Sequence, residues 1–175
     1  MMSNTLLESV VKKNRARLIP FMLALYVLAF LDRSNIGFAK ETYQLDTGLS
    51  NEAYALGAGI FFVVYAFLGV PANLLMRKFG ARKWIGCTTL LWGVLSAAMA
   101  WADTEAKFLL VRTLLGAAEA GFFPGMIYLT SQWFPQQNRA SIMGLFYMGA
   151  PLALTLGSPL SGALLEMHGL MGHPG

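Results

Sequence analysis

The chain has 175 residues, of which 56% are hydrophobic and 13% are charged, and its formal net charge is +4. Soluble domains carry about 25% charged residues, so this composition, with a mean hydropathy of +0.54, excludes an ordinary soluble domain and predicts an all-α membrane protein. The bases lie in short segments between apolar runs, which argues against a nucleic-acid partner.

Five apolar segments are each long enough to cross the lipid bilayer as a helix, which takes about 20 residues. They are Leu18–Phe38, Glu52–Met76, Trp84–Trp101, Lys107–Phe134 and Arg139–Met167. The first segment follows basic residues as a signal peptide would, but it lacks a small-residue cleavage site, so we interpret it as a retained span. We therefore divide the chain into a cytoplasmic segment (1–17), a five-helix bundle (18–167) and an outer-side tail (168–175).

The first segment ends in two charged residues, Asp32 and Arg33. A charged side chain at the centre of a membrane helix costs about 2.5–3.5 kcal/mol, so such residues usually face a protein interior or an aqueous cavity. Adjacent helical residues point about 100° apart, so the two side chains cannot face the same way. The alternative is that both extend to the outer membrane surface.

The second segment begins at a capping signal, where either Ser50 or Asn51 can accept a hydrogen bond from the helix N-terminus. It ends in a basic connection in which Gly80 can supply a tight turn. The third segment has a tryptophan at each end, Trp84 and Trp101, and we expect one indole near each membrane interface. Its Cys87, the single cysteine of the chain, is expected to be buried.

The fourth segment contains the most informative helical pattern, formed by Arg112, Gly116 and Glu119. Arg112 and Glu119 are seven residues apart, so they share one helix face at about 10 Å along the axis. We interpret this pair as functional, because ionisable groups inside spans usually are; the alternative is a structural ion pair. Gly121 and Pro124 predict a kink in the same segment.

The fifth segment follows a short turn in which we expect Pro135 to end one helix and Arg139 to start the next. Within the segment, three glycines permit close contact between helices, at Gly149, Gly157 and Gly162.

The distribution of basic residues predicts the orientation. With the N-terminus in the cytoplasm, nine of the thirteen bases are cytoplasmic: Lys12, Lys13, Arg15, Arg17, Arg77, Lys78, Arg82, Lys83 and Arg139. Only Lys40 and Lys107 lie outside, while Arg33 and Arg112 lie within spans. This asymmetry follows the positive-inside rule.

No catalytic or metal-binding motif is visible in the sequence. His168 and His173 lie in a glycine-rich tail without cysteine or carboxylate partners at metal-binding spacing, so we interpret them as surface residues. Phosphate-binding loops and nucleophile elbows are likewise absent from the sequence. We therefore expect no enzyme, no metal and no cofactor.

The motifs together resemble the major facilitator superfamily, and within it the anion:cation symporter group. The matching residues are Leu31-Asp32-Arg33-x-Asn35, the basic turn with Pro71, Asn73, Gly80 and Arg82, Arg112 with Gly116 and Ala120, Glu119 with Pro124, and Trp133-Phe134-Pro135. Asn73 replaces the aspartate usual in the superfamily, and about one extra helical turn separates it from Gly80; this variant is typical of the organic-anion group. More closely, the amino-acid sequence as a whole is similar to those of bacterial transporters of L-rhamnonate, a sugar acid.

The resemblance implies roles for particular residues. Arg33 and Arg112 would attract the carboxylate of an organic anion, and Tyr65 and Asn35 would line the substrate site. Asp32 and Glu119 would carry the coupled protons, while Asn73, Gly80, Arg82, Gly116 and Pro124 belong to signatures that support conformational change. The implied activity is proton-coupled uptake of the sugar acid through the bacterial inner membrane.

The superfamily is built from two halves of six helices, with substrate held between them. Five spans correspond to an incomplete first half, ending before a sixth span, so we expect the second half or other membrane helices as partners. The alternative is a transport-inactive membrane protein that acts by association, using a helix face that exposes Gly149, Gly157 and Gly162.

Overall fold

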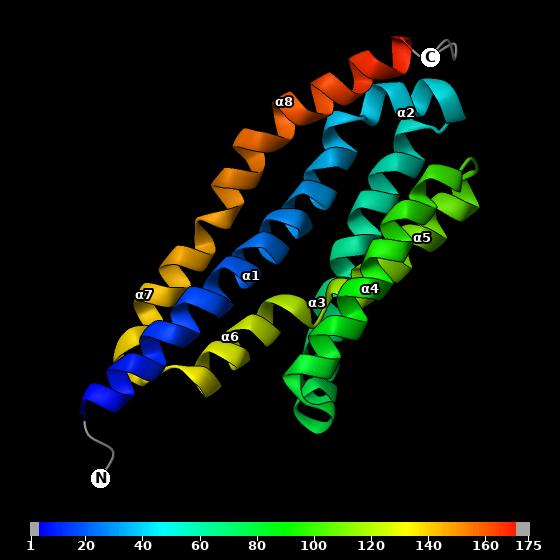
Figure 1. Ribbon diagram of the computed structural model, residues 1–175. Helices are drawn as coiled ribbons and strands as arrows, with labels where there is room; N and C mark the ends of the chain where they lie inside the picture. The colour runs from blue at the N-terminus through cyan, green and yellow to red at the C-terminus, as the bar shows by residue number, and fades with distance from the viewer. Residues whose placement is uncertain (1–3, 171–175) are drawn as a thin grey trace. The chain divides into compact units, whose positions relative to one another are not determined.

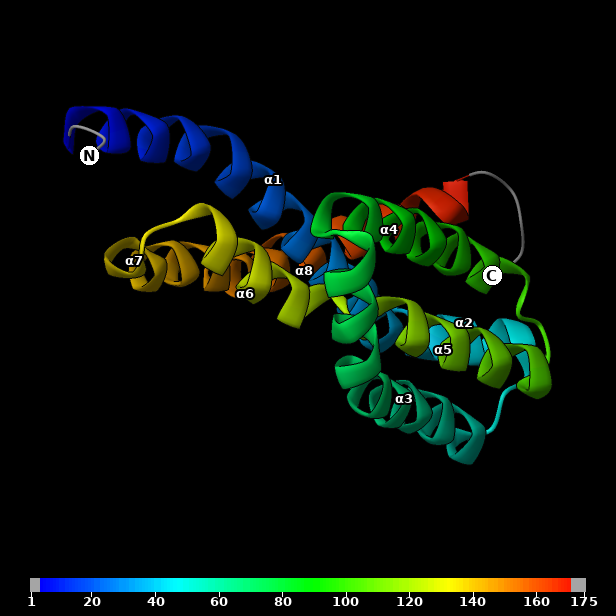
Figure 2. The same ribbon diagram turned by 90° about the horizontal axis from the view of Figure 1, so that it is seen from below.

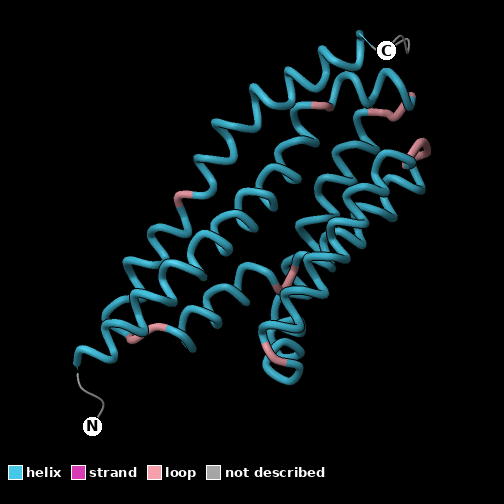
Figure 3. Tube along the Cα trace, in the orientation of Figure 1, coloured by secondary structure: helices cyan, strands magenta, loops and turns pink. Residues whose placement is uncertain are grey.

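The computed structural model describes the backbone of residues 4–170 and the side chains of residues 8–163. Within residues 4–170 the chain is helical and contains no strand (Figures 1 and 3). The elements are α1 (Asn4–Phe38), α2 (Lys40–Thr47), α3 (Asn51–Phe79), α4 (Ala81–Ala98), η1 (Met99–Trp101), α5 (Glu105–Glu119), α6 (Phe122–Trp133), α7 (Gln136–Tyr147) and α8 (Gly149–Leu170).

The prediction of five membrane spans is confirmed. In the described part of the chain five helical stretches are long and apolar enough to cross a bilayer: Glu8–Phe38, Asn51–Phe79, Ala81–Trp101, Glu105–Trp133 and Gln136–Ala163. The first helix continues through the basic segment that precedes the apolar run, so these bases lie on helix α1. The tail at residues 171–175 lies outside the described residues, and the division into three regions stays a prediction.

Two of the predicted turns are confirmed in detail. The hydroxyl oxygen of Ser50 accepts a hydrogen bond from the backbone N–H of Ala53 (3.1 Å), so Ser50 rather than Asn51 caps α3. Gly80 joins α3 to α4 with φ +87°, a conformation that residues with a Cβ rarely adopt. Its N–H donates to the carbonyl of Met76 and closes the end of α3 (2.8 Å).

The predicted kink in the fourth span is a break between two helices. Helix α5 ends at Glu119 and α6 begins at Phe122, with a turn at Ala120 and Gly121. Pro124 has no N–H with which to continue the helical ladder back to residue 120. A Cβ on Gly121 would lie 2.9 Å from the Cβ of Ala72 on α3 and 2.9 Å from Nε1 of Trp84 on α4, so glycine permits close packing at the break.

Two predictions from the sequence are wrong, and a third is not tested. Nε1 of Trp84 is buried toward Gly121, because the ring packs inward from α4, and the placement of Trp84 and Trp101 near the membrane interfaces stays a prediction. Cys87 is exposed rather than buried, because the buried side chains of α4 are those of Ile85 and Trp92, on another face of the helix. Helix α7 begins at Gln136 rather than Arg139: Arg139 instead donates hydrogen bonds to the carbonyls of Ser131 and Phe134, at the end of α6 (2.7 and 3.0 Å).

The described helices form two compact units, one of residues 1–41 and 128–175 and one of residues 42–127. In the first unit α1 packs along α7 and α8, and Figures 1 and 2 show these helices side by side. Cβ atoms on two glycines of this unit would approach side chains of α1: Gly149 at 2.6 Å from Tyr26 and Gly157 at 2.9 Å from Leu31. The prediction of an exposed helix face is therefore wrong for these two glycines, because they pack against α1. At Gly162, by contrast, nothing lies within 4 Å of the Cβ position.

In the second unit α5 packs mainly against α3, and also against α4. A Cβ on Gly116 of α5 would lie 2.5 Å from the backbone oxygen of Phe61 on α3. A Cβ on Gly57 of α3 would lie 2.2 Å from the ring of Phe108 on α5. The two helices therefore approach each other closely because each contributes a glycine at the contact.

We expect Gly116→Ala to lower the free energy of unfolding by about 1–3 kcal/mol, because the new methyl group would overlap a backbone oxygen that cannot move aside. Gly59→Ala is the matched control, since nothing lies within 4 Å of the Cβ position of Gly59 on α3. Denaturant titration in detergent micelles measures both variants. Equal stability of the two would contradict the close approach of α3 and α5.

Candidate functional site

Helix α5 buries one continuous face that contains both predicted ionisable residues. Arg112 is 2% exposed and Glu119 is fully buried. Phe108, Leu115 and Gly116 lie on the same buried face, at the three- and four-residue spacing of a helical stripe. The prediction that Arg112 and Glu119 share a face is confirmed, and this face is the one that packs against α3.

The guanidinium of Arg112 makes two contacts with α3. Its Nε–H donates a hydrogen bond to the backbone carbonyl of Gly57 (3.2 Å). Its guanidinium carbon lies 4.4 Å from the centroid of the Phe61 ring, within the range of a cation–π interaction, which is worth about 2 kcal/mol when desolvated. Both contacts stabilise the buried cation and hold it against α3.

The close approach of the helices makes both contacts possible. Gly116 lies one turn after Arg112 on α5 and brings the backbone of Phe61 against it. The carbonyl of Gly57 has two lone pairs, so it can accept from Arg112 as well as from its own helix. A larger side chain at Gly116 would separate the helices and move the ring and the carbonyl away from the guanidinium.

Tyr65 lies one turn after Phe61 on α3 and is half-buried. The two rings are nearly parallel, with an interplanar angle of 20° and centroids 6.0 Å apart. Arg112, Phe61 and Tyr65 thus form a row in which the Phe61 ring contacts both neighbours. We call this row, with Gly57 and Glu119, the α3–α5 cluster.

Gly57 and Phe61 were not predicted as site residues. Neither carries a charge, and both look like ordinary residues of an apolar helix. The four-residue spacing of Gly57, Phe61 and Tyr65 is the one available signal, because it places them on a single face of α3.

Asp32, Arg33 and Asn35 lie in the other unit, near the end of α1. Asp32 and Arg33 are half-buried, and the guanidinium carbon of Arg33 lies 5.8 Å from the centroid of the Phe30 ring. Asn35 is exposed, and its side-chain oxygen accepts a hydrogen bond from the Ser161 hydroxyl of α8 (2.9 Å). Asn35 therefore links two helices of its unit, and its role in substrate binding stays a prediction.

The signature residues occupy distinct positions in the second unit. Gly80 makes the α3–α4 turn, and Arg82 is exposed in the first turn of α4. Asn73 is half-buried on α3, Gly116 mediates helix packing, and Pro124 follows the break at the start of α6. Their part in conformational change is a prediction that the geometry leaves untested.

Two ionisable groups outside the spans have altered acidity. Burial raises the pKa of the Tyr43 hydroxyl, and the negative charge of Asp103 raises it further. A hydrogen bond from Lys107, one turn later in the chain, lowers the pKa of the Asp103 carboxyl. The Tyr43 hydroxyl also donates to the carbonyl of Ala102, so these connections between spans are held to each other by polar contacts.

Comparison with known proteins shows the family. The sequence model of the Major Facilitator Superfamily matches residues 22–171. The chain belongs to the major facilitator superfamily. It is 91% identical, over 99% of its length, to the "Inner membrane transport protein RhmT" of Escherichia coli K12, and 50% identical over 99% of its length to a "Putative tartrate transporter" of Agrobacterium vitis.

A solved structure has the same fold. It is a bacterial homologue of the human lysosomal transporter Spinster in an inward-facing, occupied conformation, with a TM-score of 0.80 and 22% identity over 86% of this chain and 32% of that one. The chain covers 41% of the Escherichia coli relative and 38% of the Agrobacterium relative. The matched region is therefore about two fifths of the length of these transporters.

We expect Phe61 and Arg112 to be energetically coupled. In a double-mutant cycle, Phe61→Leu and Arg112→Gln should show a coupling energy of about 1–2 kcal/mol in the free energy of unfolding, because each removes the same cation–π contact. Phe67→Leu is the control, since Phe67 lies on the same helix and is 78% exposed. Additive effects of the Phe61 and Arg112 substitutions would contradict the contact.

Proposed function

We propose that the protein is part of a secondary transporter that carries an organic anion, a sugar acid such as L-rhamnonate, together with a proton. The observation that carries this proposal is the guanidinium of Arg112, which is buried in the α3–α5 cluster against a carbonyl and an aromatic ring. Ionisable side chains inside membrane spans are costly and rare, and where they occur they commonly mark substrate or ion pathways.

The chemistry of arginine suits a carboxylate. The guanidinium presents a planar fork of N–H donors that matches the two oxygens of a carboxylate. In a water-poor environment this attraction is stronger than at a protein surface. The contacts with Phe61 and Gly57 hold the Arg112 side chain against α3, so the substrate would not have to order a fully flexible side chain on binding.

A sugar acid also presents several hydroxyl groups. Tyr65, which continues the row from Phe61, offers a phenolic hydroxyl that both donates and accepts hydrogen bonds. We assign Tyr65, Arg33 and Asn35 to the substrate site on the basis of the resemblance to anion:cation symporters. The "Putative tartrate transporter" relative supports this class of substrate, because tartrate is also a hydroxy acid.

Glu119 and Asp32 are proposed to carry the coupled protons. A carboxyl group exists in a charged and a neutral form, so it can move one proton through an apolar region. Glu119 is fully buried at the end of α5, next to the helix break, and lies on the same face as Arg112. Protonation at Glu119 would therefore alter the electrostatic environment of the anion site.

The proposed setting is the bacterial inner membrane, with the N-terminus in the cytoplasm. The inner membrane appears in the name of the Escherichia coli relative. The orientation rests on the basic residues, which lie mainly at one end of the spans under this arrangement.

The test uses a chimera in which this chain replaces the matching residues of the Escherichia coli relative. In vesicles, a proton gradient should drive accumulation of labelled L-rhamnonate. Glu119→Gln should abolish accumulation, because glutamine cannot carry a proton, while exchange of labelled for unlabelled substrate continues. Glu105→Gln is the matched control on the same helix, since Glu105 is exposed.

Proton-driven accumulation that persists in the Glu119→Gln chimera would contradict the coupling role. The 175-residue chain alone is assayed beside the chimera. Uptake by the chimera but not by the chain alone would mean that the cluster needs the remaining helices of a full transporter. No uptake by either protein would overturn the proposed substrate.

A further inference from the structure

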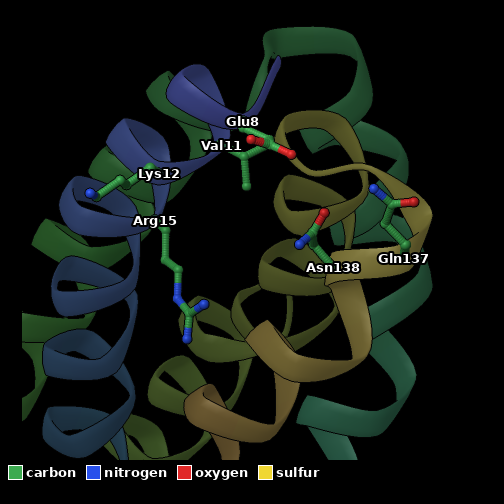
Figure 4. Close-up of a pocket in the computed structure, with 6 residues that line it drawn as sticks. All are labelled: Glu8, Val11, Lys12, Arg15, Gln137 and Asn138. Atoms are coloured by element: carbon green, nitrogen blue, oxygen red, sulfur yellow. The ribbon is translucent and has the colours of Figure 1, made fainter. Parts of the chain in front are cut away.

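A second polar site lies in the first unit, between the basic segment of α1 and the first turn of α7. The structure contains a cavity there of about 300 Å³. It is lined by Glu8, Val11, Lys12, Arg15, Gln137 and Asn138 (Figure 4). Both helices belong to the same unit and contact each other directly. None of these residues has a role in the proposed transport reaction.

The position of the apolar run leads us to infer that the cavity lies at the level of lipid headgroups. Arg15 precedes the apolar run that begins at Leu18 by three residues, or about 5 Å along the helix. On the other side, Asn138 lies in the first turn of α7, which follows Pro135. We therefore expect both walls to lie at the boundary between the polar segment and the apolar span, where phospholipid headgroups lie.

The cavity combines groups that suit opposite charges. Arg15 extends from α1 along the gap between the helices, and the amide of Asn138 extends toward the same gap from α7 (Figure 4). The N-terminus of α7 adds a partial positive charge, and Pro135 provides no side-chain cap for it. These groups favour an anion such as phosphate.

The carboxylate of Glu8, in contrast, favours a cation. Glu8 lies seven residues before Arg15, about 10 Å along the helix, and its carboxylate extends toward α7 at the other end of the cavity (Figure 4). A purely anionic ligand would be repelled by this carboxylate. A ligand with a phosphate at one end and an ammonium at the other has a group of opposite charge for each of Arg15 and Glu8.

We propose that this cavity binds the headgroup of an aminophospholipid, with its phosphate at Arg15 and Asn138 and its primary ammonium at Glu8. The guanidinium and the amide donate hydrogen bonds to phosphate oxygens, and the ammonium donates to the carboxylate of Glu8. The lipid would hold the start of α7 against α1 at the membrane surface.

Native mass spectrometry of the chain in neutral detergent tests the proposal, with three lipids of identical acyl chains. Phosphatidylethanolamine should be retained about fivefold more than phosphatidylcholine, because the quaternary ammonium has no N–H to donate to Glu8. Phosphatidylglycerol should also be retained less, because it offers no cation to this carboxylate. This comparison needs no variant and so does not depend on the folding of one.

Two variants locate the site. Glu8→Gln should equalise retention of phosphatidylethanolamine and phosphatidylcholine, while Arg15→Gln should weaken retention of both by about fivefold. Arg17→Gln is the matched control: it removes the same charge from the same segment, but Arg17 does not line the cavity. It should leave retention unchanged.

Several results would overturn the proposal. Equal retention of phosphatidylethanolamine and phosphatidylcholine by the unmodified chain would remove the role of Glu8. Equal loss of lipid retention in Arg15→Gln and Arg17→Gln would mean that the lipid is attracted to the basic segment as a whole and not to this cavity. Displacement of the lipid by an equal concentration of soluble phosphoethanolamine would identify a site for soluble anions instead of lipid.

Discussion

The second unit depends on one constraint: the positively charged side chain of Arg112 has to be held inside an apolar pair of helices. The chain meets this constraint with groups from α3, the carbonyl of Gly57 and the ring of Phe61. Both can reach the guanidinium because Gly116 lets the backbones of α3 and α5 approach. The same contacts therefore pack the two helices together and stabilise the charge of Arg112.

The helix break after Glu119 extends this arrangement. Because α5 ends at Glu119 and α6 begins at Phe122, the buried carboxyl lies at the end of a helix rather than in its middle. The turn at Ala120 and Gly121 packs against α3 and α4. A change of backbone conformation at this turn would therefore move Glu119 and alter the packing of the helix face that carries Arg112. In the proposed transporter, this would be a short physical route between the proposed proton site at Glu119 and the proposed anion site at Arg112.

Much of this architecture follows from sequence patterns that depend on local chemistry. The apolar runs predict the five spans, and Ser50 and Gly80 predict their turns because capping and positive φ are properties of single residues. Cys87 was misplaced for a different reason: in an almost wholly apolar helix, periodicity does not distinguish lipid-facing from protein-facing positions. The partners of Arg112 were missed because Gly57 and Phe61 are brought to it by tertiary packing across 55 and 51 residues of chain.

The central claim is that Arg112 recognises the carboxylate of a sugar acid. It is tested most directly by measuring the affinity of the chimera for L-rhamnonate and for L-rhamnitol, the neutral polyol that keeps the hydroxyl groups but lacks the carboxylate. Loss of the charged partner of a buried guanidinium predicts binding of the polyol weaker by at least about thirtyfold. Equal affinity for the acid and the polyol would contradict the account.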